Sequence, residues 1–99
     1  PQINVQVGGI TLLIRGRRPG ETPRLPDPMK HFDRYSSHDV WGVDHFGFAY
    51  HGDLTSFCEV AKQRGATFSV DPWEFSPGAL ICYLSAPDGV SIEVVEAKR

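Results

Sequence analysis

The sequence has no long apolar run and only two cysteines. No stretch approaches the roughly 20 consecutive apolar residues of a membrane span, and the amino terminus lacks a basic segment followed by a hydrophobic one, so we expect neither an anchor nor export. Cys58 and Cys82 have no CxxC spacing and are too few for a disulfide framework. We therefore interpret both as buried thiols of a cytoplasmic protein.

The sequence also lacks an unbroken stripe of positive charge. Ten Lys and Arg residues are set against 12 Asp and Glu residues, which gives a net charge of −2, and the arginines of residues 15–34 are interleaved with acidic side chains. Proteins that bind nucleic acids usually carry clustered basic residues. We therefore expect no nucleic-acid partner and no membrane, and a small molecule as the ligand.

The length and composition indicate one small globular domain. The chain has 99 residues, of which 40% are hydrophobic and 22% are charged. A domain of this size buries a smaller fraction of its surface than a larger one does. Pairing with a second copy would add buried surface, so we expect a homodimer.

Two segments precede the part of the chain with the clearest pattern. In residues 1–18, Ile3, Val5 and Val7 alternate with polar residues before Gly8-Gly9, which predicts a β-hairpin. Residues 19–40 contain many helix and strand breakers, namely Pro19, Gly20, Pro23, Pro26 and Pro28. Because so long a loop is unusual inside a compact domain, we interpret this stretch as a Pro-rich linker between two units.

Residues 41–99 read as one α+β module. A strand over 42–50 is followed by a helix over 53–64, which Asp53 can cap and Gly65 can end. A short strand over 67–70, a proline-bounded loop over 71–78, a strand over 80–84 and a turn over 87–89 lead into the last strand. This pattern predicts a mixed sheet with one packed helix, in the order strand, helix, strand, strand, strand.

The order of elements and two segments carry a resemblance to a known family. Residues 42–50 place a histidine in the first strand, and residues 86–95 combine a Pro-Asp-Gly turn with an alternating strand that holds a glutamate. The module resembles one βαβββ unit of the vicinal oxygen chelate superfamily, which includes glyoxalases, bleomycin-resistance proteins and extradiol dioxygenases. Because Gly8-Gly9 lines up with Asp88-Gly89, the N-terminal hairpin resembles the last two strands of a preceding unit.

The resemblance implies a divalent-metal site and residues that would form it. Members of the superfamily pair two units and draw their metal ligands from the first and last strands of each, which here are His45 and Glu93. An imidazole and a carboxylate suit Zn, Ni, Mn or Fe(II), and Glu93 could also act as the catalytic base of a lyase, isomerase or dioxygenase. Since Leu13 occupies the position of the corresponding glutamate in the hairpin, one chain lacks a full ligand set, and a second subunit would have to complete the cleft.

Other interpretations of the same residues stay open. His45 could be a polar residue satisfied on a half-exposed strand, and Glu93 could face solvent or Arg15 instead of a metal. Three further histidines are expected at the surface: His31, His38 and His51. Four aromatic residues could line a pocket for a flat ligand or simply fill the core: Trp41, Trp73, Phe75 and Tyr83. The alternative functions are a metal-free dimer that binds a small molecule or drug, and an inactive truncated remnant.

Overall fold

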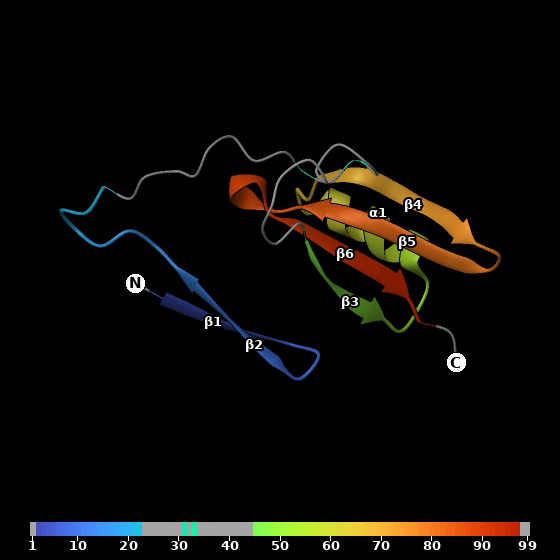
Figure 1. The fold of residues 1–99 in the computed structure, drawn as a ribbon, viewed down its shortest axis with the longest axis horizontal. Helices are drawn as coiled ribbons and strands as arrows, with labels where there is room; N and C mark the ends of the chain where they lie inside the picture. The colour runs from blue at the N-terminus through green and yellow to red at the C-terminus, as the bar shows by residue number, and fades with distance from the viewer. Residues whose placement is uncertain (1, 23–30, 32, 34–44, 98–99) are drawn as a thin grey trace.

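The computed structural model describes residues 2–22, 31, 33 and 45–97 and shows an α+β protein (Figure 1). It contains a two-stranded hairpin and a four-stranded sheet with one α-helix beside it. The elements are β1 (Gln2–Val7), β2 (Ile10–Arg15), β3 (Phe46–Tyr50), α1 (Leu54–Gln63), β4 (Phe68–Ser76), β5 (Ala79–Ser85), the 3₁₀ turn η2 (Pro87–Gly89) and β6 (Ser91–Glu96). Within this part of the chain, no helix has the length and apolar character needed to cross a membrane.

The four-stranded sheet is mixed, as the sequence predicted. Its spatial order is β3-β6-β5-β4, and β3 runs parallel to β6 whereas the other neighbours are antiparallel. A parallel pair requires a long crossover connection. Here α1, β4 and β5 provide it, and in Figure 1 the helix lies behind the sheet.

Helix α1 begins and ends where the sequence predicted. The Asp53 carboxylate accepts hydrogen bonds from the backbone N–H groups of Thr55 and Ser56, which satisfies two donors that a helix start leaves unpaired. Gly65 follows the helix with φ of 95°, a left-handed conformation that glycine adopts without strain. The Glu96 carboxylate of β6 accepts a third bond from Leu54 N at 3.0 Å, so the last strand also holds the helix start.

Each face of the sheet has its own apolar cluster. On the helix side, Leu54 and Cys58 of α1 pack against Cys82 and Val94, and all four are buried. On the opposite face, Val70, Ile81 and Tyr83 are buried together, with Trp73 and Val95 packed partly against them. Because side chains alternate along a strand, β5 contributes Cys82 to one cluster and its two neighbours to the other.

Strand β4 corrects one prediction from the sequence. We expected a strand that ends at Val70 and a loop over residues 71–78, but β4 continues from Phe68 to Ser76 and includes Pro72. The register with β5 shifts between Val70 and Trp73, so Pro72 lies in a bulge, and β4 is at the end of the sheet order. A proline that cannot donate a backbone hydrogen bond is tolerated at such a position.

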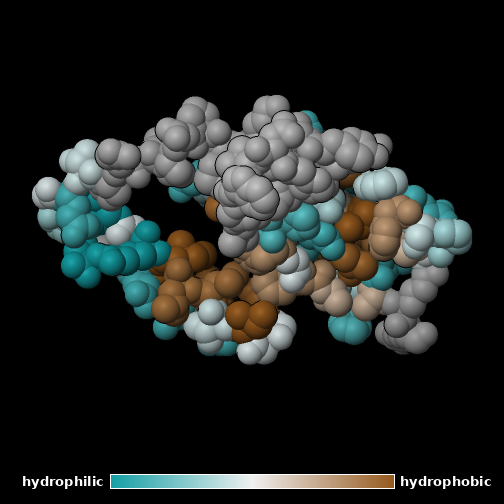
Figure 2. Space-filling model, viewed as in Figure 1, coloured by the Kyte–Doolittle hydropathy of each residue, from teal (hydrophilic) through white to brown (hydrophobic). Residues whose placement is uncertain are grey.

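The predicted N-terminal hairpin is present, and its two faces differ sharply. Gly8 and Gly9 form the turn with φ of 53° and 81°. The register places six aliphatic residues on one face: Ile3, Val5, Val7, Ile10, Leu12 and Ile14. Several remain exposed, among them Ile3 at 64%, and Figure 2 shows the resulting hydrophobic surface along the hairpin. Most of the predicted linker, residues 19–40, lies outside the described residues. So do residues 42–44, the first three of the strand predicted over 42–50.

Candidate functional site

His45 and Glu93 lie on the same face of the sheet, as alternation along the strands predicted, but β3 begins at Phe46, so His45 directly precedes the strand in which we expected it. Glu93 is in the middle of β6, and its partner across the parallel pair is Gly47, two residues after His45. A Cβ at Gly47 would be 2.7 Å from the Glu93 carbonyl oxygen. The absence of a side chain there lets β3 and β6 approach closely, so that His45 reaches the Glu93 carboxylate.

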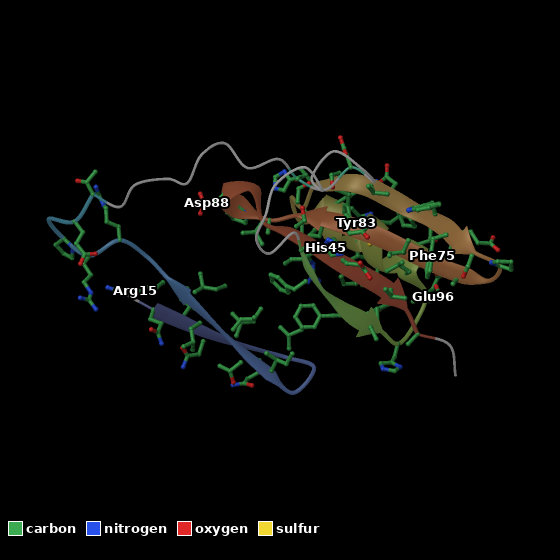
Figure 3. The ribbon with its side chains drawn as sticks, in the orientation of Figure 1. Arg15, His45, Phe75, Tyr83, Asp88 and Glu96 are labelled. Carbon is green, nitrogen blue, oxygen red and sulfur yellow. The ribbon has the colours of Figure 1, made fainter. Side chains whose placement is uncertain are left out.

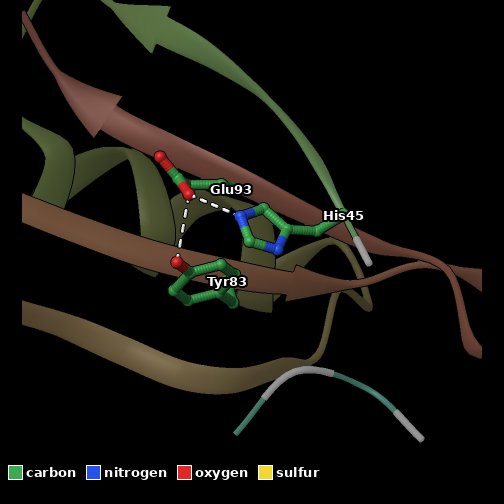
Figure 4. A network of polar contacts seen from close by, with 3 residues as sticks. All are labelled: His45, Tyr83 and Glu93. Atoms are coloured by element: carbon green, nitrogen blue, oxygen red, sulfur yellow. Dashed lines mark hydrogen bonds and ion pairs between the residues drawn. The ribbon is translucent and has the colours of Figure 1, made fainter. Parts of the chain in front are cut away.

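A third residue, Tyr83, joins this pair (Figure 4). His45 Nε2 lies 2.8 Å from Glu93 Oε2, and Tyr83 Oη donates a hydrogen bond to the same oxygen at 3.0 Å. The His45 and Tyr83 rings also meet edge to face, with 5.1 Å between their centroids. We call these three residues the His–Glu–Tyr cluster. Its carboxylate is therefore held from two sides, by Tyr83 of β5 and by His45 directly before β3.

The cluster is half-buried at the border of an apolar region. The side chains of His45 and Glu93 are 24% and 25% exposed, so both can be reached from solvent, whereas Tyr83 is buried. Val70 and Ile81 pack beside Tyr83 on this face. Charge interactions are stronger next to low-dielectric surroundings than in water. A cation that reaches this face would therefore meet the Glu93 carboxylate in surroundings that are partly apolar.

The geometry of the pair fits a shared divalent cation. Donor atoms at about 2.0–2.2 Å from an ion are roughly 2.8–3.1 Å apart when they are adjacent in an octahedral site, and roughly 3.3–3.6 Å apart in a tetrahedral one. The separation of 2.8 Å between His45 Nε2 and Glu93 Oε2 is that of a direct hydrogen bond and lies at the short end of the octahedral range. Within the described residues, no group of three or more His, Cys, Asp or Glu side chains is close enough to hold a metal. The described part of one chain thus offers two ligands.

The other predicted site residues are distributed differently. Tyr83 is part of the cluster. Trp73 is partly buried and packs against Val70, Ile81 and Tyr83. Phe75 is 46% exposed and lies at the far end of the sheet in Figure 3, apart from His45. Trp41 lies outside the described residues. The aromatic pocket therefore remains a prediction.

The remaining polar candidates are separate from the cluster. Arg15 is exposed on the hairpin, well away from His45 in Figure 3, whereas Glu93 takes its partners from β5 and from the residue before β3. His51 is exposed, as expected, and His38 lies outside the described residues. His31 is less exposed than expected, because its Nε2 donates a hydrogen bond to the Ala86 carbonyl oxygen at 2.7 Å.

The sequence reasoning missed the role of Tyr83, although a signal was present. The turn over 87–89 is flanked by the paired residues Ser85 and Ser91, and counting two residues outward on each strand places Tyr83 opposite Glu93. Cross-strand partners on one face are close enough for long side chains to meet. A hairpin register drawn from the turn would therefore have found the contact.

Comparison of the chain with protein-family models, curated proteins and solved structures gives no match. The His–Glu–Tyr cluster, with the sheet that positions it, is therefore the feature of this protein that points to a function.

Proposed function

We propose that the protein is a divalent-metal-dependent small-molecule lyase, isomerase or dioxygenase of the vicinal oxygen chelate type. The observation that carries this proposal is the 2.8 Å approach of His45 Nε2 to Glu93 Oε2 on a half-exposed sheet face. The two donors come from the residue directly before the first strand of the module and from its last strand, and that superfamily draws its ligands from the first and last strands. The strand order β3-β6-β5-β4, with α1 against one face, supports the same assignment.

The residues of the chain would have distinct tasks. His45 and Glu93 would hold Zn, Ni, Mn or Fe(II), and such an ion polarises a substrate oxygen and stabilises negative charge on it. Tyr83 holds the Glu93 carboxylate through Oη and supports the His45 ring by its edge. Ligands that are fixed in this way bind a metal more tightly than free ones. The half-exposed Glu93 carboxylate would also be the group placed to accept a proton from the substrate.

The proposal requires a second subunit. Two protein ligands from one chain leave a weak site, whereas a twofold axis duplicates every residue at an isologous interface. A homodimer that brings two His–Glu pairs together would supply four ligands. The cleft between the subunits would then hold the substrate.

Metal binding tests the proposal directly. We expect the purified protein, dialysed against Zn²⁺, Ni²⁺, Mn²⁺ or Fe²⁺, to retain about one ion per dimer when it is analysed for metal content. His45→Gln and Glu93→Gln each remove one ligand and should lose the ion. His51→Gln and Glu59→Gln are matched controls, because both residues are exposed and lie outside the cluster.

The outcomes distinguish the two main functions. Retention of metal by wild type and by the controls, with loss in both site variants, would support the enzyme and justify a screen of lyase, isomerase and dioxygenase substrates. A protein that stays metal-free at every ion tested contradicts it.

One observation favours a metal-free binding protein as the second candidate. Position 13, which the resemblance assigns to a ligand in the preceding unit, is a leucine that is 62% exposed, and the His45–Glu93 contact satisfies both groups without an ion. In that case Trp73 and Tyr83, which pack beside Val70 and Ile81, would contact a bound organic molecule. Quenching of the tryptophan fluorescence by aromatic ligands, unchanged by a chelator, would identify this function.

A further inference from the structure

The helix-side core contains a pair of thiols whose contact no pattern in the sequence predicted. Cys58 lies on α1 and Cys82 on β5, 24 positions apart, and their sulfur atoms are 3.5 Å from each other. Both residues are free thiols and almost fully buried, with 2% and 0% of their surface exposed. Neither belongs to the His–Glu–Tyr cluster, which lies on the opposite face of the sheet.

The contact follows from how the helix packs. Cys58 is one turn after Leu54 on the buried stripe of α1, and Cys82 faces the helix from the second strand of the βββ part, beside Val94. The sulfur atoms are therefore the point at which α1 meets the interior of the sheet. A disulfide requires an S–S distance of about 2.05 Å, so the sulfurs must move together by roughly 1.5 Å.

We propose that Cys58 and Cys82 form a redox-sensitive dithiol, which closes to an intramolecular disulfide on oxidation and fastens α1 covalently to β5. The oxidant is a low-molecular-weight disulfide or an azo compound such as diamide. One thiolate attacks the oxidant, and the second attacks the sulfur of that adduct. Two S–H bonds are replaced by one S–S bond, and two electrons and two protons pass to the oxidant, which leaves as two thiols or as a hydrazine.

Burial decides when this reaction occurs. In the closed core an oxidant cannot reach either sulfur, and burial raises the pKa of both thiols, that of Cys82 to about 12, so thiolate is scarce near neutral pH. The reaction therefore passes through states in which α1 has lifted from the sheet. Local opening of this kind has its own free energy, smaller than that of global unfolding. The rate of disulfide formation should accordingly report the stability of α1.

Oxidation of the native protein by diamide tests the proposal. We expect the reacted protein to lose about 2 Da, to run as a monomer on a non-reducing denaturing gel and to resist alkylation after unfolding. Closing a loop of this length should also raise the melting temperature by about 10 °C or more, reversibly on reduction. Cys58→Ser and Cys82→Ser should show neither the mass loss nor the temperature shift.

A variant remote from the sulfurs tests whether local opening of α1 controls the rate of disulfide formation. Asp53→Ala removes the helix cap at an exposed position and should accelerate disulfide formation by about fivefold, since a lost cap shifts an opening equilibrium by about that factor. Glu59→Ala, also exposed on α1, is the matched control and should react at the wild-type rate. If Asp53→Ala forms the disulfide at the wild-type rate, opening of α1 does not control the reaction. Absence of the disulfide in native buffer, or formation of disulfides between chains instead, would overturn the proposal itself.

Discussion

Tyr83 determines how the Glu93 carboxylate is presented. Its hydroxyl donates to the oxygen that also contacts His45, and its ring supports the imidazole from the side. A carboxylate on a flexible side chain would otherwise lose rotamer freedom each time it binds a cation. Tyr83 has already restricted that freedom before a ligand arrives, so it acts as a positioning residue for the proposed metal site.

Removal of that hydroxyl gives a prediction for metal affinity. Tyr83→Phe keeps the ring and should leave the fold intact, but the affinity for the preferred divalent ion should fall about 10- to 100-fold, as for other partners of metal ligands. Isothermal titration calorimetry of wild type and variant measures the change. Tyr50→Phe is the matched control, because Tyr50 packs against Phe57 on the helix side. An unchanged affinity in Tyr83→Phe would limit this tyrosine to packing.

Cys82 gives the protein a pH dependence with a defined sign. Burial, and after it the contact with Cys58, raises the pKa of this thiol from 9.0 to about 12. The folded state keeps the thiol neutral while the unfolded chain releases its proton above about pH 9, so the stabilisation is complete below that pH and is lost as the pH rises towards 12. Within this window the loss is about 1.4 kcal/mol per pH unit.

Urea unfolding of wild type and Cys82→Ala checks this dependence. The variant loses packing at every pH, but it has no thiol to titrate at this position. The difference in unfolding free energy between the two proteins should therefore narrow between about pH 9 and pH 10.5. A difference that stays constant over this range would show that Cys82 is not protected from ionisation.

The pairing of β3 with β6 depends on one glycine. Gly47 faces Glu93 across the parallel pair, and a Cβ there would lie 2.9 Å from the Glu93 Cβ and closer still to its carbonyl oxygen. Since two of these contacts are with backbone or with the first side-chain atom, the strands themselves must move to relieve them. The site and the sheet are thus coupled through the same position.

Gly47→Ala should disturb both. Forcing a methyl group into the contact should cost about 1–3 kcal/mol of unfolding free energy, and it should separate His45 from the Glu93 carboxylate. Chemical unfolding measures the first effect and metal affinity the second. Ala49→Ser is the control, since Ala49 lies two residues further along the same strand and is exposed, so a change within about 0.5 kcal/mol is expected.

The elements differ in how far the sequence revealed them. Helix α1 was predicted with both ends, because Asp53 and Gly65 act locally and need no tertiary partner. Strand β4 was predicted too short, because a proline usually ends a strand. The sequence does not show that Pro72 lies at the end of the sheet, where a proline is tolerated. The shared face of His45 and Glu93 followed from alternation along the strands. The Cys58–Cys82 contact did not, since it depends on how α1 is rotated against the sheet.

At the scale of the whole molecule, the hairpin is the least self-sufficient part. Two strands with one apolar face are marginal alone, and Ile3, Ile10 and Ile14 remain 53–64% exposed. Their face contains no charged side chain in the observed register, whereas the other face is mostly polar. The homodimer that the proposed site requires would give these residues a surface to contact.

We therefore expect self-association that weakens when this face is made polar. Ile3 and Ile14 are cross-strand partners, and their replacement by serine should raise the dissociation constant of the dimer at least tenfold, because each buried isoleucine contributes roughly 1.5–3 kcal/mol. Sedimentation equilibrium over a range of concentrations measures it. Gln6→Ser with Thr11→Ser changes the opposite face and should leave association unchanged. A wild-type protein that is monomeric at all concentrations would contradict both the dimer and the shared cleft.

The bulge at Pro72 makes the two ends of the four-stranded sheet unequal. A strand arriving beside β4 would meet a bent backbone that lacks one amide donor, whereas β3, at the other end, has neither proline nor bulge. The sheet is therefore more readily extended at β3 than at β4. Within the described strands of this sheet, a second copy that adds a strand would therefore meet a regular backbone at β3 and an interrupted one at β4.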